Sequence, residues 1–247
     1  MEAGTTPRAG FGLELDRIEA AVDEGDTDLR RLGFWRVVGL IKRDDELIER
    51  HADQVGRIDT KAFRAGVRFR APVWVGVGLQ VLGIAVGVGA VAFAIWNANA
   101  RPSDRLLSVE LASALALLLA AFTWAAGIHS LAHHVVGRLV GIGFTDFFFA
   151  IPPPPLPGLK TDYATYLRVS PVARAWMHAS GAIATKLAPF VAVLFAPADA
   201  PSWARWVVLG LGLFQIATDL LFSTKASDWK KVRRELAVAR ARRGPAR

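Results

Sequence analysis

A run of 30 consecutive residues without a charged side chain constrains this sequence most. It covers residues 71–100 and reads APVWVGVGLQVLGIAVGVGAVAFAIWNANA. Crossing the ~30 Å hydrocarbon core of a bilayer takes about 20 apolar residues in a helix with a rise of ~1.5 Å per residue. Further uncharged runs cover residues 111–128, 187–197 and 206–218. We therefore expect an all-α membrane protein with about four transmembrane helices.

The formal net charge of +8 leaves two classes open, a nucleic-acid binder and a membrane protein. A nucleic-acid binder gathers Lys and Arg on one folded face. Here most charged residues lie in residues 1–70 and 225–247, outside the apolar runs. This separation favours a protein whose main partner is the lipid bilayer and argues against nucleic acid as a partner.

The charge pattern divides the chain into three parts. Residues 1–70 are predicted to form a small cytoplasmic region of amphipathic helices. Its helices are expected at residues 11–23, 28–50 and 57–70. This region is either a cap packed on the membrane domain or an interfacial segment. Residues 71–224 are expected to form the transmembrane domain, and residues 225–247 a basic cytoplasmic tail.

The segment of residues 139–157 is apolar but is not expected to form a regular spanning helix. Gly141, Gly143 and the prolines at residues 152–155 interrupt it, and proline removes a backbone hydrogen bond from a helix. Irregular backbone survives at membrane depth only where protein or a water cavity satisfies its polar groups. We expect a re-entrant or strand-like segment beside a site on the cytoplasmic side.

Basic residues near the ends of the apolar runs predict the orientation, because cytoplasmic loops carry an excess of Lys and Arg. Lys and Arg are frequent just before residue 71, between residues 138 and 174 and in the C-terminal tail. Residues 198–202, in contrast, contain no basic residue. Both termini are therefore expected in the cytoplasm. The abundance of Ala, Arg and Gly favours a prokaryote, so we expect a multi-pass protein of a prokaryotic plasma membrane.

Three of the five histidines fall in one short segment, His129-Ser-Leu-Ala-His133-His134. Residues four apart lie on the same face of a helix. His129 and His133 could therefore present two nitrogen atoms to one tetrahedral zinc ion. Histidine inside a membrane span is costly and indicates function. The alternative is that these side chains only bond to neighbours or lipid headgroups at the end of the span.

A catalytic zinc site usually takes three protein ligands and a water molecule. The sequence has no cysteine, which excludes thiolate ligands. The alternatives for the third ligand are His134, His178, Asp219 and Asp228. Asp219 has two other roles open to it, as acceptor for an imidazole N–H and as ion-pair partner of Lys186 or Lys225.

This arrangement resembles the site-2 protease family of intramembrane zinc metalloproteases. The resemblance covers residues 115–235. It includes His129-Ser-Leu-Ala-His133, Gly137-Arg-Leu-Val-Gly-Ile142, Ser180-Gly-Ala-Ile-Ala-Thr185, Asp219 and Asp228. It implies a metalloprotease-like transmembrane domain in which His129, His133 and Asp228 bind zinc. Thr185 would then stand where the family has an asparagine.

One departure from the family pattern affects the chemistry. Ser130 occupies the position of the catalytic glutamate, which takes a proton from zinc-bound water and returns it to the leaving amine. Asp219 and His134 are the candidates for a replacement base. The resemblance implies an impaired zinc-dependent peptidase for membrane-embedded or membrane-proximal substrates, or a pseudoprotease that binds or regulates membrane partners. A structural membrane protein without metal is the third hypothesis.

The histidine segment also matches one histidine box of the membrane desaturases and hydroxylases. The di-iron sites of those enzymes need several such boxes, whereas this chain has one box and five histidines in all. This comparison argues against a di-iron enzyme.

Overall fold

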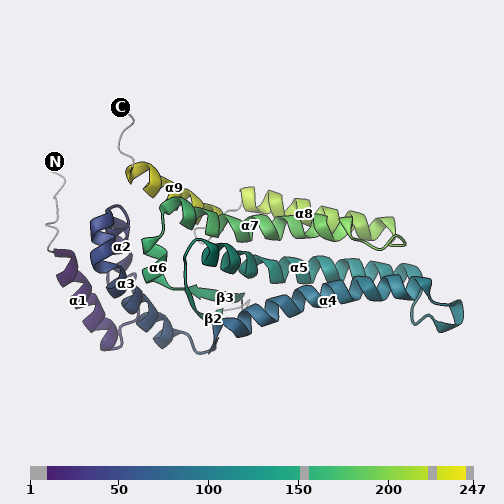
Figure 1. Ribbon diagram of the computed structural model, residues 1–247, viewed down its shortest axis with the longest axis horizontal. Helices are drawn as coiled ribbons and strands as arrows, with labels where there is room; N and C mark the ends of the chain where they lie inside the picture. The colour runs from purple at the N-terminus through teal and green to yellow at the C-terminus, as the bar shows by residue number, and fades with distance from the viewer. Residues whose placement is uncertain (1–9, 151–155, 222–226, 243–247) are drawn as a thin grey trace. The chain divides into compact units, whose positions relative to one another are not determined.

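The computed structural model describes residues 10–150, 156–221 and 227–242 (Figure 1). The helices are α1 (Gly10–Asp23), α2 (Phe34–Ile41), α3 (Asp45–Gly66), α4 (Val73–Asn99), α5 (Val109–Leu139), α6 (Tyr163–Arg168), α7 (Pro171–Leu194), α8 (Ser202–Leu221) and α9 (Asp228–Arg242), with a 3₁₀ turn at Pro102–Asp104. The strands are β1 (Arg70–Ala71), β2 (Phe144–Ala150) and β3 (Leu156–Thr161). The predicted helical class is confirmed, but all-α is too simple, because the described residues also contain a three-stranded antiparallel sheet.

The residues group into two compact units, each of which gathers segments that are distant in the sequence. The helix–sheet unit consists of Met1–Val73, Gly137–Arg174 and Arg234–Arg247. The long-helix unit consists of Trp74–Val136 and Ala175–Arg233. The predicted division at residues 70 and 224 follows sequence order and stays a prediction about domains.

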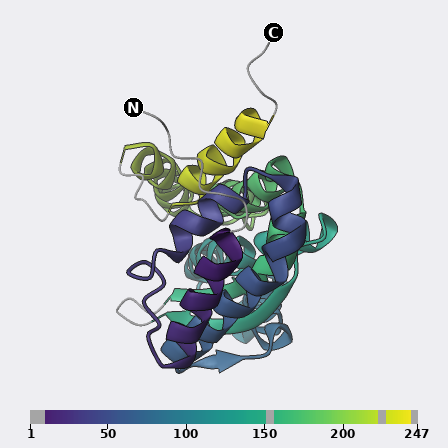
Figure 2. The ribbon, with the colours of Figure 1, turned by 90° about the vertical axis from the view of Figure 1, so that its left-hand side faces the viewer.

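In the helix–sheet unit, α1, α2 and α3 pack around one apolar core (Figure 2). The bounds predicted for the second and third helices are wrong. Gly33 adopts left-handed backbone with a φ of 80°, and α2 begins only after it. The Asp44 side chain then accepts hydrogen bonds from two backbone N–H groups and starts α3 as its N-cap. α3 continues through Asp59, whose buried carboxylate pairs with Lys160.

The segment predicted to be re-entrant or strand-like contains β2 and β3. These strands pair antiparallel from Phe144↔Thr161 to Ala150↔Leu156, and β1 pairs with β2. Gly141, with a φ of 93°, ends α5 before the first of them. The structure therefore has the strand-like alternative, and its depth in a membrane stays a prediction. The prolines at residues 152–155 lie outside the described residues.

Four long helices, α4, α5, α7 and α8, provide most of the described part of the long-helix unit, and α4 runs beside α5 (Figure 1). Two glycines allow this close approach. A Cβ added at Gly87 would lie 2.4 Å from the Nε1 atom of Trp124. A Cβ added at Gly127 would lie 2.8 Å from the carbonyl oxygen of Gln80. Backbone approach through small residues is typical of helix packing in lipid.

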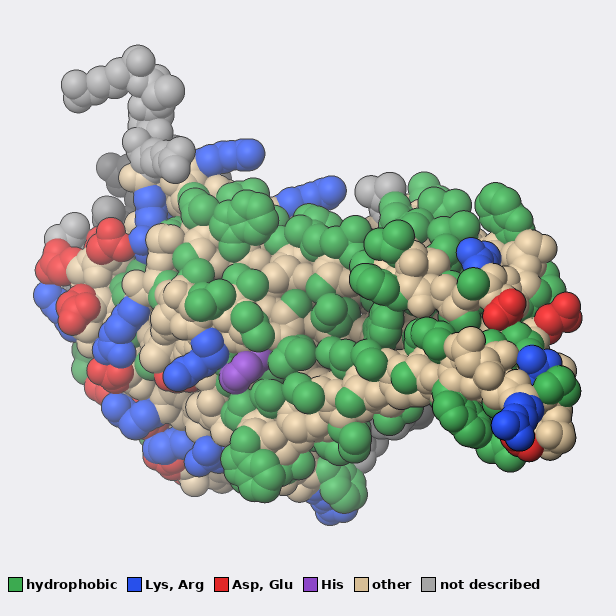
Figure 3. Space-filling model, turned by 45° about the vertical axis from the view of Figure 1, so that its right-hand side comes forward, with side chains coloured by type: hydrophobic (Ala, Val, Ile, Leu, Met, Phe, Trp, Pro, Cys, Tyr) green, Lys and Arg blue, Asp and Glu red, His purple; other side chains and the backbone are tan. Residues whose placement is uncertain are grey.

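Within the described residues, three helices are long and apolar enough to cross a membrane, namely α4, α5 and α7. They expose large apolar side chains, among them Leu82, Phe122 and Leu187. Figure 3 shows apolar side chains gathered over the long helices. These features support the prediction of a membrane protein. The fourth predicted span corresponds to α8, which is outside this set, so the count of four stays a prediction.

Candidate metal centre

The histidine segment lies near the carboxyl-terminal end of α5. The uncharged run of residues 111–128 stops before the histidines, but α5 continues to Leu139, so they lie inside a regular helix. His129 and His133 share one helix face, as their spacing predicts, with ring centroids 4.7 Å apart. Every residue that contributes to this centre belongs to the long-helix unit.

A backbone carbonyl selects the tautomer of His133. The Nδ1 atom of His133 lies 2.6 Å from the carbonyl oxygen of Met177 in α7. Because a carbonyl oxygen only accepts hydrogen bonds, Nδ1 must carry a proton. In the neutral ring the Nε2 atom then presents a lone pair. Hydrogen bonds of this kind orient the histidine ligands of metal ions.

Thr185 selects the same tautomer for His129. The Thr185 hydroxyl group donates its hydrogen to the carbonyl oxygen of Gly181, one turn earlier in α7, at 2.8 Å. Its oxygen therefore accepts from the Nδ1–H group of His129, at 2.9 Å. The Nε2 atom of His129 is left with a lone pair as well.

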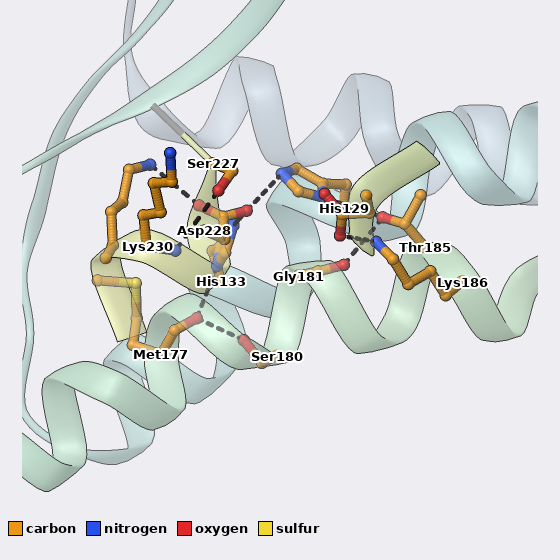
Figure 4. A network of polar contacts seen from close by, with 12 residues as sticks. His129, His133, Met177, Ser180, Gly181, Thr185, Lys186, Ser227, Asp228 and Lys230 are labelled. Carbon is orange, nitrogen blue, oxygen red and sulfur yellow. Dashed lines mark hydrogen bonds and ion pairs between the residues drawn. The ribbon is translucent and has the colours of Figure 1, made fainter. Parts of the chain in front are cut away.

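Asp228 is the first residue of α9, and its carboxylate faces both histidines (Figure 4). Its Oδ2 atom lies 3.4 Å from His129 Nε2 and 3.3 Å from His133 Nε2. Its Oδ1 atom pairs with Lys231 Nζ at 2.9 Å. Burial by itself would raise the pKa of Asp228, but a hydrogen bond that His133 donates from Nε2 when its ring is doubly protonated, together with the Lys231 charge, outweighs burial and holds that pKa below its usual value.

Three electron-pair donors thus converge: two imidazole nitrogen atoms and one carboxylate oxygen, all within 4.8 Å of one another. Acceptors that face one another repel unless a cation lies between them, either as protons on the imidazoles or as a metal ion. In a tetrahedral zinc site with bonds of ~2.0–2.1 Å, neighbouring ligand atoms lie about 3.3–3.4 Å apart. The two Nε2–Oδ2 distances match this spacing, and the two Nε2 atoms lie within 4.8 Å of each other, so the donor types and two of the three separations fit zinc.

Three other residues singled out from the sequence do not supply a ligand atom to this group, as far as the described residues go. Ser130, at the position of the family glutamate, is buried in α5. His134 follows His133 in the same helix and is half-buried. The ring centroid of His178 in α7 lies 6.3 Å from that of His133.

Asp219 also lies outside the converging group. Its Oδ2 atom in α8 is 2.6 Å from the Nζ atom of Lys186 in α7. This is one of the two ion pairs open to Asp219 from the sequence, and the other partner, Lys225, lies outside the described residues. The structure therefore brings Asp228, not Asp219, to the histidines.

Sequence reasoning misses two features that shape the centre. The Met177 carbonyl orients His133, and a backbone carbonyl leaves no trace in the residue type. Gly181 makes room for the same ring, since an added Cβ would lie 2.3 Å from His133 Nε2. Glycine is unfavourable in the middle of a helix, so its presence just before the apolar run of residues 187–197 was the available signal.

Comparison with known proteins identifies no relative. No protein-family model, no curated protein and no solved structure matches this chain. The resemblance to site-2 proteases therefore rests on the motifs of the sequence alone.

Proposed function

We propose that this protein is a membrane-embedded zinc protein of the site-2 protease type with an impaired peptidase site. His129, His133 and Asp228 would hold the ion. The observation that carries the proposal is the convergence of three lone pairs, with both imidazole tautomers selected by hydrogen bonds to Met177 and Thr185. The proposed location is a prokaryotic plasma membrane, with both termini in the cytoplasm and α8 as a fourth span.

Three protein ligands leave the fourth position of zinc for water or a substrate oxygen, which is typical of catalytic sites. A zinc ion held by these residues would supply Lewis-acid chemistry toward a water molecule or a carbonyl group. The chain itself keeps both imidazole rings oriented through their Nδ1–H bonds and supplies the carboxylate. On the basis of the site-2 protease resemblance, the proposed substrates are peptide bonds of membrane-embedded or membrane-proximal proteins.

Ser130 leaves the site without the general base of the family. A positioned base typically contributes about 10²–10⁴-fold to the rate, and a serine hydroxyl is no base at neutral pH. Asp219 is paired with Lys186 and, within the described residues, supplies no atom to the converging group. We therefore infer slow hydrolysis by the native chain. The same Ser130 favours the second candidate function, a pseudoprotease that binds or regulates membrane partners.

Metal content of the detergent-purified protein tests the proposal first. We expect about one zinc per chain and its loss in the His129→Ala/His133→Ala double variant. Asp228→Asn should also lower the zinc content, whereas His178→Ala removes an imidazole outside the converging group and should keep it. A native chain that holds no zinc, even after dialysis against zinc without chelators, would contradict the proposal.

Ser130→Glu separates an impaired peptidase from a pseudoprotease. The added carboxylate should raise the cleavage rate of a reconstituted transmembrane substrate by about 100-fold or more. The same variant with His129→Ala is the control that should stay inactive. Unchanged cleavage by a Ser130→Glu protein that still binds zinc would support the pseudoprotease instead.

A further inference from the structure

A buried ionic cluster in the helix–sheet unit surrounds Glu235 of α9. Only 4% of Glu235 is exposed, and its Oε1 atom lies 2.7 Å from Lys42 Nζ and 2.9 Å from the Tyr166 hydroxyl group. Its Oε2 atom lies 2.7 Å from the Nε atom of Arg174, which is completely buried near the start of α7. The proposed zinc chemistry uses none of these four residues.

The cluster is better suited to selecting one geometry than to adding stability. Desolvation offsets much of the attraction within a buried ion pair, and apolar replacement of a whole pair is often neutral or stabilising. Charge-assisted hydrogen bonds are directional, however, so the bonds that Glu235 accepts from Lys42 and Tyr166 allow fewer arrangements than apolar packing does. Because Glu235 belongs to α9 and Arg174 to α7, the pair ties these two helices together.

Both helices lead directly from this ion pair to the proposed zinc centre. Glu235 follows Asp228 by seven residues in α9, which is two helical turns and about 10 Å along one face. Arg174 precedes Met177 by three residues in α7, and the carbonyl group of Met177 orients His133. Each half of the pair is thus within two turns of a residue that shapes the centre.

The helix that carries the third ligand needs an anchor. An isolated helix as short as α9 is marginal in water, and neighbouring positive charges in it repel one another. These charges are Lys230, Lys231, Arg233 and Arg234. Glu235 is the one buried residue among those described in α9. Arg242 attaches the far end of α9 to the Lys42 carbonyl and to Asp45, so loss of the Glu235 contacts would loosen the half of the helix that begins with Asp228.

We infer that Glu235 and Arg174 are positioning residues for the zinc centre, because their ion pair keeps Asp228 and the carbonyl group that orients His133 in place. This inference rests on the proposed function. A chain without the pair would keep all three ligands but would bind zinc more weakly, since ordering α9 would consume part of the binding free energy.

Zinc affinity of the full-length protein in detergent, measured by competition with a chelator, tests this inference. Glu235→Gln keeps the shape of the side chain and removes its charge. We expect the zinc dissociation constant to rise about tenfold or more, as for other groups that orient metal ligands. Arg233→Gln removes a charge from an exposed position of the same helix and should leave the constant unchanged. Equal constants for Glu235→Gln and the native chain would overturn the inference.

Cobalt substitution separates positioning from a general loss of stability. The visible spectrum of bound Co²⁺ depends on ligand type and geometry. The Co²⁺ spectrum of the Glu235→Gln protein should therefore become more like the spectrum of the Asp228→Asn protein. If the pair only stabilised the fold, folded Glu235→Gln protein would keep the native spectrum and zinc affinity, and the inference would fail. If Glu235→Gln does not purify as a helical protein, Arg174→Lys replaces it in both measurements. Lysine keeps the positive charge but lacks the guanidinium geometry, so the zinc affinity should fall and the Co²⁺ spectrum should change in the same way.

The native chain distinguishes the two proposals. If it binds no zinc, the proposed function itself fails. If it binds zinc and the positioning variants bind zinc equally well, only the inference about Glu235 and Arg174 fails.

Discussion

At the scale of single residues, two hydrogen bonds determine what the histidines of α5 present to Asp228. Each Nδ1–H group donates to an oxygen atom of α7, one from the Met177 carbonyl and one from the Thr185 hydroxyl. Both Nε2 atoms are then left facing the Asp228 carboxylate. A histidine in water samples both tautomers, so these bonds convert two ordinary side chains into an oriented pair of metal ligands.

Thr185→Val should weaken zinc binding without changing a ligand. Valine has the shape of threonine but cannot accept the Nδ1–H bond of His129, so we expect the zinc dissociation constant to rise about tenfold or more. Thr185→Ser keeps the hydroxyl group and should keep the zinc dissociation constant at its native value. Thr218→Val is the matched control, because Thr218 makes the same bond to its own helix in α8, from its hydroxyl group to the Phe214 carbonyl. Chelator competition that finds equal constants for Thr185→Val and Thr218→Val would contradict the assigned tautomer.

Gly181→Ala should remove zinc by steric displacement. The new Cβ would lie 2.3 Å from His133 Nε2, so the ring would have to leave its ligand position. Alanine favours a helix by about 1 kcal/mol over glycine, so the helix itself should not suffer. The measurement is zinc per chain beside thermal unfolding of the metal-free protein, with Gly210→Ala as control, since a Cβ there meets no atom within 4 Å. Zinc retained at the native level would show that the ring has room to shift and still bind.

At the scale of elements, the sequence predicts where helices exist better than where they end. The predicted second helix over residues 28–50 is interrupted, because Gly33 takes a positive φ and Asp44 caps a new helix. The third helix, predicted over residues 57–70, begins instead at Asp45, and Asp59 lies within it and pairs with Lys160 of β3. The Asp59–Lys160 pair joins residues 101 apart in the chain, and local periodicity contains no information about such a partner.

His51 of α3 gives the α1–α3 packing a predicted pH dependence. Its side chain is buried, and its Nε2 atom has no hydrogen-bond partner among the described residues. Burial lowers the pKa of His51, as does the charge of Arg50, while Asp16 acts in the opposite sense. As the pH falls, the unfolded state, with a pKa of about 6.5, therefore binds a proton before the folded state does. Stability should be constant above about pH 7 and decline below about pH 6.5.

Hydrogen exchange of the α1 and α3 amides at pH 7.5 and 5.5, corrected for intrinsic rates, measures this effect. His51→Leu keeps an apolar side chain at the buried position and cannot titrate. The native chain should lose more protection at the lower pH than the variant does. An equal loss in both proteins would assign the pH dependence to other groups.

At the scale of the whole molecule, the chain passes between its two units several times. It leaves the helix–sheet unit after Val73, returns at Gly137, leaves again after Arg174 and returns at Arg234. A division into consecutive segments, as read from charge and hydropathy, cannot represent this arrangement. The membrane assignment depends only on helix length and composition, so it could be made without knowing the packing.

The predicted orientation can be tested directly because the chain has no cysteine of its own. We expect a Ser103→Cys variant, in the exposed loop between α4 and α5, to react with a membrane-impermeant maleimide added to intact cells. A Glu24→Cys variant, exposed after α1, should react only after lysis, because basic residues favour the cytoplasmic side. The opposite labelling pattern would reverse the proposed topology, and equal labelling of both in intact cells would contradict a membrane-spanning chain.

By itself the sequence determined the apolar helices and the pairing of His129 with His133 on one face. Both follow from local rules, since a spanning segment must satisfy its own backbone hydrogen bonds and residues four apart share a helix face. The family resemblance favoured Asp228 as the third ligand, but only the tertiary structure brought Asp228, rather than Asp219, to the histidines and selected the imidazole tautomers. Those outcomes depend on contacts 56 and 95 residues apart in the chain, and no local pattern of residues specifies which distant oxygen atom a given nitrogen meets.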